Sequence, residues 1–275
     1  MILDSYYKFL LKQNSKFHNL YKGMSCYILG NGSSIKFIDI NDLKNLKSIS
    51  INLMVLHKDF KELDTCGYVL PESYFFYRYF INPYDKKLKE NIIGNLFRKK
   101  IGGFQGINLF TSVTNFLGAP IKNTYYLHHF GERTPNKNYI DLTNRFSFMS
   151  GGLYAAIGLA IYYGFSKAIL VGCDYLMTPR QYGHFYSAPR QADLQDESNA
   201  YPELLLEIKD LIDLEILCVD SSSQWLNSIQ YSNLSTKPIK YRENTNIVDK
   251  ESLNEMHRAH MDGQFPSRIF VNEKD

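Results

Sequence analysis

Short apolar runs alternate with helix-like segments along most of the chain. Five runs have the length and composition of buried strands, and polar or glycine residues follow them. These predicted strands cover residues 25–29, 46–55 with the end near Asn52, 67–70, 168–172 and 214–219. Apolar residues at helical spacing predict helices over 4–20, 86–100, 150–164 and 201–211. This alternation favours a three-layer, Rossmann-like α/β domain with a mostly parallel sheet.

The same pattern predicts how the chain is organised. We expect an N-terminal helix in residues 1–24, a single α/β domain in 25–240 and a C-terminal extension in 241–275. Residues 82–144 mix Gly, Asn, Thr and aromatic residues without a clear period, which indicates an irregular insertion or a small lid. The N-terminal helix and the C-terminal extension are the segments that we expect to support a homo-oligomer or peripheral contact with a membrane, and the sequence does not choose between them.

Composition and charge narrow the class of protein. The chain has 275 residues, of which 44% are hydrophobic and 21% charged, so it can bury a large core. A formal net charge of +3 is too balanced to predict a nucleic-acid partner. The start of the chain lacks the pattern of a secretory leader, and no window reaches the about 18 apolar residues of a spanning helix. Four widely spaced cysteines are typical of buried thiols in a reducing cytoplasm: Cys26, Cys66, Cys173 and Cys218.

Ligands of open parallel sheets collect beyond the carboxyl ends of the strands, which selects a few polar segments. They are Gly30–Ser34, Asn52, 71–73, 173–186 and 220–223. The first of them reads Gly-Asn-Gly-Ser-Ser, and two interpretations stay open for it. It is either an ordinary turn or a loop that offers backbone N–H groups and the hydroxyls of Ser33 and Ser34 to a phosphate at the start of a following helix.

A second segment carries candidate acid–base chemistry. Within a dozen residues after Asp174 come four tyrosine or histidine side chains: Tyr175, Tyr182, His184 and Tyr186. An imidazole that takes up a proton near pH 7, next to phenols that donate hydrogen bonds to a leaving phosphate, suits a metal-free transfer from an activated sugar. The alternative is a solvent-exposed loop with a scattered histidine.

Signals for a metal are weak, and we expect no metal cofactor. The chain has no Asp-x-Asp pair, the carboxylate clamp of many metal-bound nucleotide sugars. His257 and His260 have the spacing of ligands on one helix face but lack the glutamate of a zinc protease helix. We interpret them as part of a surface helix.

Several of these segments together resemble a known family. The chain resembles bacterial lipooligosaccharide sialyltransferases that use CMP-sialic acid. The resemblance is carried by residues 28–39 with the Gly-Asn-Gly-Ser-Ser turn, by Asn52 at a strand end, and by the segment from Ser150-Gly151 to the Gly-Cys-Asp174 strand end. The resemblance covers roughly residues 25–80 and 145–230. It implies a GT-A-like fold and metal-independent, inverting transfer of a sialic-acid-like sugar from a nucleotide-sugar donor to a surface glycan or glycolipid.

The resemblance also implies roles for individual residues. It makes Tyr182 one of two tyrosines that support the departing phosphate; Leu176 stands where the second belongs, so that role passes to Tyr175. Pro71 replaces a nucleotide-binding asparagine of the family, and the family's catalytic histidine lies farther downstream than His184, which takes the role of base here. The predicted catalytic residues are His184, Tyr182, Tyr175 and Tyr186. The predicted nucleotide-binding residues are Gly30, Asn31, Gly32, Ser33, Ser34, Asn52, Ser150, Gly151 and Asp174.

Two other functions remain open from the sequence. The Gly-Asn-Gly-x-Ser opening and the Gly-x-Asp strand end also resemble a pterin diphosphokinase-like family, whose chemistry needs magnesium held by carboxylates. A non-catalytic protein of surface-polysaccharide assembly would keep the glycine turn and tolerate replacement of His184.

Overall fold

An eight-stranded sheet forms the centre of the protein in the computed structural model, which describes residues 2–81, 86–118, 122–128, 140–146, 151–179, 183–187 and 202–264. Its strand order is β10-β9-β8-β1-β2-β3-β6-β7, and every pairing is parallel. The strands are β1 Ser25–Leu29, β2 Lys47–Ile51, β3 Thr65–Leu70, β6 Leu109–Ser112, β7 Thr124–Leu127, β8 Lys167–Val171, β9 Asp213–Cys218 and β10 Asn227–Gln230. The predicted α/β fold with a mostly parallel sheet is therefore confirmed.

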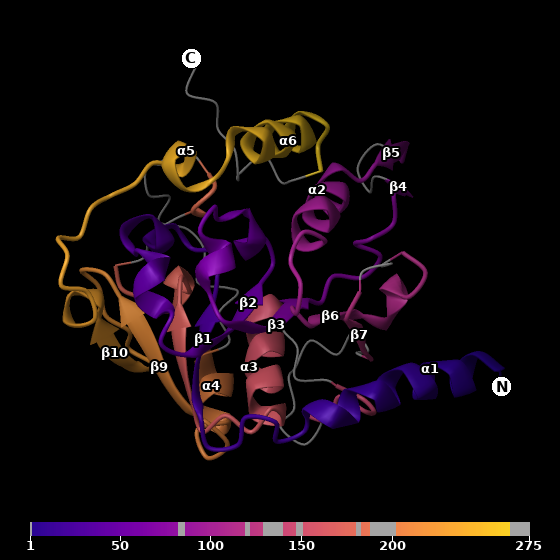
Figure 1. The fold of residues 1–275 in the computed structure, drawn as a ribbon, viewed down its shortest axis with the longest axis horizontal. Helices are drawn as coiled ribbons and strands as arrows, with labels where there is room; N and C mark the ends of the chain where they lie inside the picture. The colour runs from indigo at the N-terminus through magenta and orange to yellow at the C-terminus, as the bar shows by residue number, and fades with distance from the viewer. Residues whose placement is uncertain are drawn as a thin grey trace.

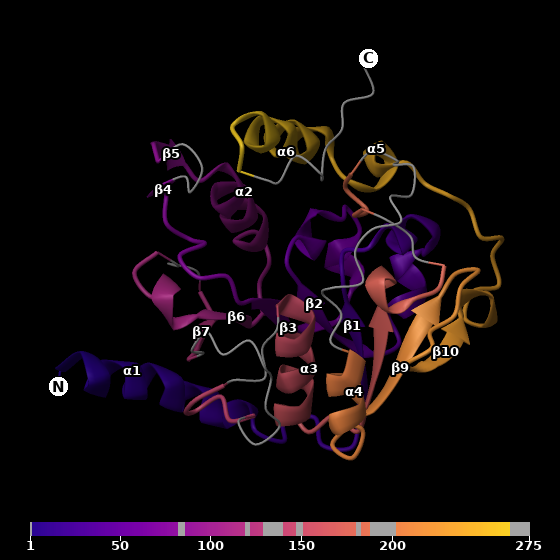
Figure 2. The same ribbon diagram turned by 180° about the vertical axis from the view of Figure 1, so that it is seen from behind.

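Helices cover the sheet and extend past its edges. The α-helices are α1 Ile2–Lys12, α2 Ile92–Ile101, α3 Gly152–Tyr162, α4 Pro202–Glu207, α5 Asn244–Ile247 and α6 Lys250–Met261. A separate antiparallel pair joins β4 Tyr79–Ile81 to β5 Leu88–Glu90. The 3₁₀ helices are η1 Gln13–Phe17, η2 Ser33–Phe37, η3 Ile40–Leu43, η4 Met54–Leu56, η5 Phe60–Glu62, η6 Val113–Asn115, η8 Asp174–Leu176 and η9 Tyr231–Asn233. Figures 1 and 2 place α5 and α6 beyond the carboxyl ends of the central strands.

The chain changes direction across the sheet at β1. From β1 it moves outward through β2, β3, β6 and β7, and α3 then leads it back to β8 on the other side of β1. Helix α3 packs on β1, β2 and β3, and its side chains are buried on nearly all sides, as the apolar sequence of this segment predicts. The carboxyl ends of β1 and β8 therefore form the switch point at which α/β sheets bind ligands.

The segment 82–144 differs from the predicted irregular insertion. It supplies β6 and β7, two strands of the main sheet. Each has only four residues, with threonine or serine among them, so neither shows the long apolar run by which the other strands are recognised. The predicted helix over 86–100 begins only at Ile92, because the side chain of Asn91 caps it by accepting a hydrogen bond from Gly94 N.

The two ends of the described chain pack on this domain. Phe17 anchors the N-terminal segment, with its ring 5.1 Å from that of Phe110. At the other end, α6 packs on α2. Among the described residues there is no helix with both the length and the apolar character of a membrane-spanning segment.

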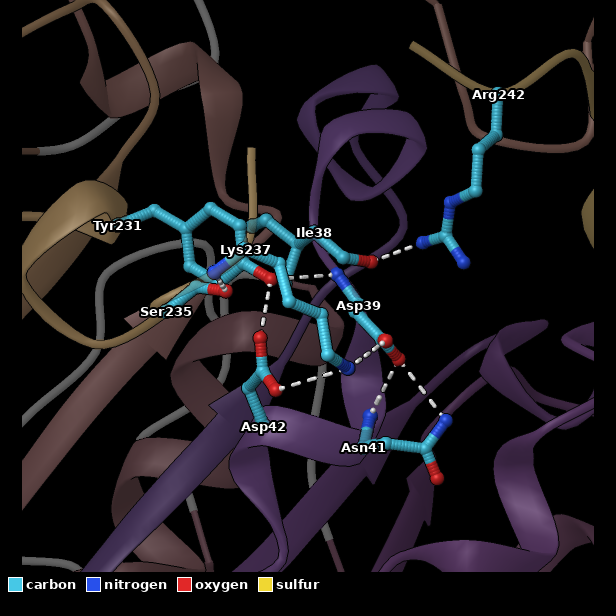
Figure 3. A network of polar contacts seen from close by, with 8 residues as sticks. All are labelled: Ile38, Asp39, Asn41, Asp42, Tyr231, Ser235, Lys237 and Arg242. Atoms are coloured by element: carbon cyan, nitrogen blue, oxygen red, sulfur yellow. Dashed lines mark hydrogen bonds and ion pairs between the residues drawn. The ribbon is translucent and has the colours of Figure 1, made fainter. Parts of the chain in front are cut away.

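The α-helix expected after the glycine turn is absent. The short 3₁₀ helices η2 and η3 form within residues 33–43 instead. Side chains from residues 231–242 contact residues 38–42 of this stretch (Figure 3). The Tyr231 hydroxyl donates to Asp42 at 2.6 Å and accepts from Asp39 N at 2.9 Å. Lys237 lies 3.0 Å from Asp39, and the Arg242 guanidinium donates to the Ile38 carbonyl.

We expect this network to make stability depend on acidic pH. Burial by itself raises the pKa of Asp39, but hydrogen bonds from Asn41 and Lys237 hold it at about 2, below the ordinary 3.8. Asp39 therefore stabilises the fold above pH 3.8 and loses this effect as the pH falls toward 2. Lys237→Met should lower the free energy of unfolding at pH 5, where the Asp39 carboxylate is ionised, and should have a smaller effect at pH 2, where Asp39 is partly protonated.

Urea unfolding at both pH values measures this difference. The matched control is Lys240→Met, which changes an exposed lysine in the same segment. Equal losses for the two variants, or a loss that does not depend on pH, would contradict the assignment.

Candidate active site

The glycine turn after β1 lies directly against the turn after β8. Gly30 N donates to Val171 O at 2.7 Å, and Gly32 N donates to Gly172 O at 2.8 Å. A Cβ atom on Gly30 would lie 2.4 Å from Gly172 O, and one on Gly32 would lie 2.4 Å from Cγ of Asp174. Both positions require glycine because no side chain fits between the two turns.

Asp174 holds the glycine turn in place. Its buried carboxylate accepts hydrogen bonds from Ser34 N at 2.8 Å, Ser34 Oγ at 2.5 Å and Ser33 Oγ at 3.4 Å. Burial raises the pKa of Asp174 to about 6, although these hydrogen bonds act in the opposite direction. The sequence predicts that the N–H and hydroxyl of Ser34 face a phosphate, but both donate to Asp174, and Ser34 is only 1% exposed.

Two asparagines at neighbouring strand ends carry buried oxygen atoms without a partner in the described part of the chain. Asn31 follows β1; its Nδ2 donates to Ile51 O at 3.2 Å, but its Oδ1 has no partner. Asn52 follows β2 in a left-handed conformation with φ of 50°, and its Oδ1 also has no partner. Because buried polar atoms are nearly always paired, these two oxygens indicate a place for ligand donors.

The amino end of α3 lies beside Asn52. A Cβ atom on Gly152, the first residue of α3, would be 2.7 Å from Asn52 Oδ1. Gly151 precedes it with φ of 86°, and no side chain caps the helix there. The first N–H groups of a helix have no partner within it and attract anions. Gly151 is exposed, so a phosphate can reach this end; Ser150 lies outside the described residues.

The segment 183–187 is anchored over the glycine turn. Gly32 and His184 form an antiparallel bridge, and Phe185 N donates to Asn31 O at 3.0 Å. Lys36 Nζ donates to Ser187 O at 2.8 Å. These contacts bring His184, a candidate from the sequence, next to Asn31. Gly32 and His184 are 152 positions apart in the chain.

His184 is suited to accept a proton. Burial lowers the pKa of its imidazole below 6.5, while a hydrogen bond with the Asn31 backbone acts in the opposite direction. The ring is therefore neutral at pH 7. Its Nδ1 is buried and has no partner in the described part of the chain.

Two of the predicted tyrosines lie in the described structure. Tyr175 is 39% exposed, and the ring of the buried Tyr186 lies 5.0 Å from that of His184. Desolvation by the surrounding protein raises the pKa of both phenols above the usual 10, that of Tyr175 although part of its side chain reaches solvent. Both stay protonated and can donate hydrogen bonds. Tyr182 lies outside the described residues.

Glu72 is a candidate that the sequence analysis did not identify. Glu72 lies in segment 71–73, which follows β3 and was selected because ligands bind beyond the carboxyl ends of parallel strands. No sequence motif distinguishes Glu72 within this segment. Glu72 is exposed to solvent, and desolvation by the neighbouring protein raises the pKa of its carboxyl group to about 7. Its charge in turn raises the pKa of Tyr186, which places the two side chains near each other.

Other candidate residues take no part in this site. The four cysteines are buried and free, as predicted. His257 and His260 lie on α6. Within the described ranges, no group of three His, Cys, Asp or Glu side chains is arranged to hold a metal ion.

No protein-family model and no curated protein matches the sequence. Two solved structures are similar to this chain over most of its length. One is the sialyltransferase CstII from Campylobacter jejuni in complex with a substrate analogue, cytidine-5'-monophosphate, with 16% identity, a TM-score of 0.46, and coverage of 87% of this chain and 98% of that chain. The other is a tyrosine-to-phenylalanine variant of the sialyltransferase Cst-II in complex with CMP, with 15% identity, a TM-score of 0.44, and coverage of 86% and 98%.

Proposed function

We propose that the protein is a glycosyltransferase that moves a sialic-acid-like sugar from a CMP-activated donor to a hydroxyl group of a glycan or glycolipid. One observation carries the proposal: three buried side-chain atoms without a partner in the described structure belong to segments that follow β1 and β2 or lie over the glycine turn. They are Asn31 Oδ1, Asn52 Oδ1 and His184 Nδ1. The resemblance of the sequence to CMP-dependent sialyltransferases supports the choice of nucleotide.

The two asparagines and α3 suit a nucleoside monophosphate. The amino group of cytosine and the hydroxyls of ribose are donors, and the amide oxygens of Asn31 and Asn52 are acceptors. The phosphate would lie at the amino end of α3, where the helix dipole and the N–H groups favour an anion. In this proposal Asp174 and Ser34 shape the loop and do not contact the nucleotide.

The reaction would need one proton acceptor and one or more donors. His184 Nδ1 takes the proton of the acceptor hydroxyl as its oxygen bonds to the anomeric carbon. At the same time the bond between that carbon and the phosphate oxygen breaks, and CMP leaves. The protonated Tyr175 hydroxyl, with Tyr182 and Tyr186, donates hydrogen bonds that stabilise the charge on the leaving phosphate. No step requires a metal ion.

Binding of CMP without magnesium is the direct test. At a concentration 100 times its Kd, CMP stabilises the folded state by about 2.7 kcal/mol, which corresponds to a rise in Tm of about 5–10 °C. Asn52→Asp should abolish this rise, because it places a negative charge beside the phosphate. It should leave the Tm of the free protein unchanged or higher, because an acidic side chain at a helix amino end is favourable.

Asn19→Asp is the matched control, since Asn19 also has a positive φ, of 57°, and contacts Tyr162 and Gly164 at the opposite end of α3.

The measurement is a thermal shift with CMP, UDP, GDP and ATP, each with and without magnesium. A shift with ATP and magnesium alone would favour diphosphokinase chemistry. No shift with any nucleotide would favour a non-catalytic assembly protein.

A further inference from the structure

One side of the molecule exposes large apolar side chains. Six of them are 44–73% exposed, and we call them the apolar flank: Tyr6, Phe9, Tyr79, Ile81, Leu88 and Leu117. They belong to α1, the pair β4–β5 and the segment that follows η6. Figures 1 and 2 show α1 and β4–β5 on the same side of the molecule, at the right in the first view and at the left in the second.

Direct contacts connect the parts of the apolar flank. The rings of Tyr6 and Tyr7 meet that of Phe116 at 5.9 and 5.7 Å, which joins α1 to the segment after η6. The Tyr77 hydroxyl donates to Thr114 O at 3.3 Å, which joins η6 to the residues before β4. These contacts hold the elements of the flank next to one another on this side of the molecule.

A cavity of about 620 Å³ lies within this surface, next to β4 and α2. Most of its lining is aromatic or aliphatic, including Phe75, Phe80 and Ile93. Two of the polar lining side chains form hydrogen bonds with the backbone of the wall: Asn91 Nδ2 donates to Phe75 O at 2.6 Å, and Gln264 Oε1 accepts from Ile92 N at 3.0 Å. The cavity therefore suits an apolar occupant.

Exposed basic side chains accompany the flank in the described part of the chain: Lys12, Arg78 and Lys86. Two described acidic groups nearby face basic partners, since Glu90 lies 3.6 Å from Arg258 and Asp262 lies 3.4 Å from Lys89. A surface that combines exposed aromatic and aliphatic side chains with basic residues is complementary to anionic lipid headgroups above hydrocarbon.

We propose that the apolar flank docks on the surface of an anionic lipid bilayer, with a hydrocarbon chain entering the cavity. Ser73 and Tyr74 line the cavity, and they directly follow Glu72 of the candidate active site. If the proposed function holds, a lipid-linked acceptor bound in this way presents its sugar to the active site. Docking itself does not depend on that function.

Sedimentation with vesicles tests the docking. The full chain should bind vesicles of phosphatidylcholine with 30% phosphatidylglycerol, not pure phosphatidylcholine, and 0.5 M NaCl should weaken the binding. Leu88→Asp should lower partitioning about tenfold or more by removing the burial of one leucine, and Arg78→Glu should lower it about tenfold through the lost attraction. Leu206→Asp changes a leucine that is 51% exposed on α4 and should have no effect.

The cavity has its own test. In a Trp225→Phe background, Phe80→Trp places the only tryptophan in the cavity wall, and vesicles with brominated acyl chains should quench its fluorescence. The native Trp225, near β10, should not be quenched. The proposal is wrong if anionic vesicles do not bind, if Leu206→Asp weakens binding as much as Leu88→Asp, or if the cavity tryptophan is not quenched.

A different result would also overturn the proposal. If light scattering shows dimers of the wild-type chain and Leu88→Asp makes them monomeric, the flank is an interface between two copies of the chain. None of these assays uses a sugar donor, so their failure leaves the nucleotide-binding test untouched.

Discussion

Replacing His184 by alanine should lower kcat for sugar transfer by about 10²–10⁴-fold, the usual contribution of a general base. KM for the CMP donor should change little, because the nucleotide contacts of the proposed site are made by Asn31, Asn52 and α3. His257→Ala is the matched control, since His257 is exposed on α6, and it should retain full activity. Single-turnover and steady-state rates with a CMP-activated donor measure the difference.

The pH profile distinguishes His184 from Glu72 as the base. A base must be deprotonated to act, so kcat/KM rises with pH through its pKa and then levels off. Burial places the pKa of His184 below 6.5 and that of Glu72 at about 7. With His184 as base, the midpoint of the rise should lie below pH 6.5, and Glu72→Gln should keep most of the activity. A midpoint near pH 7, with Glu72→Gln inactive, would move the role to Glu72.

Gly30→Ala should destabilise the protein by about 3 kcal/mol, the upper range for an overpacked core. The added methyl carbon would lie 2.4 Å from Gly172 O and 3.1 Å from Cys173 Sγ. The nearest of these atoms belongs to the backbone of a central strand end, which cannot turn away as a flexible side chain can. The corresponding drop in Tm is about 6–12 °C.

Urea unfolding measures this effect, and Gly103→Ala is its control. A methyl group on Gly103 would meet only Lys100 O, at 3.4 Å, so this variant should differ from the wild type by at most about 0.5 kcal/mol. If Gly30→Ala proves as stable as the control, the two turns do not hold each other and the rigid loop assumed for the nucleotide site is wrong.

The local pattern of the sequence was sufficient for most of the fold. The runs at 25–29 and 168–172 correspond to β1 Ser25–Leu29 and β8 Lys167–Val171, because a strand buried on both faces must be apolar throughout. The uniformly apolar segment after Gly151 forms α3 for the same reason. Strands β6 and β7 were not predicted. Their serine and threonine residues break the apolar pattern, and these strands are recognised only once the neighbouring strands of the sheet are in place.

For the site, the sequence by itself determined which residues follow the strand ends, and parallel strands bring those residues to one edge of the sheet. It therefore pointed to Asn31, Asn52 and Asp174. Only the tertiary structure decided what each of them contacts. Ser34 meets Asp174 across 140 positions, and His184 reaches the glycine turn across a similar distance along the chain. Sequence periodicity reports the burial of neighbouring residues, whereas hydrogen-bond partners and the raised pKa of Glu72 depend on segments that only folding brings together.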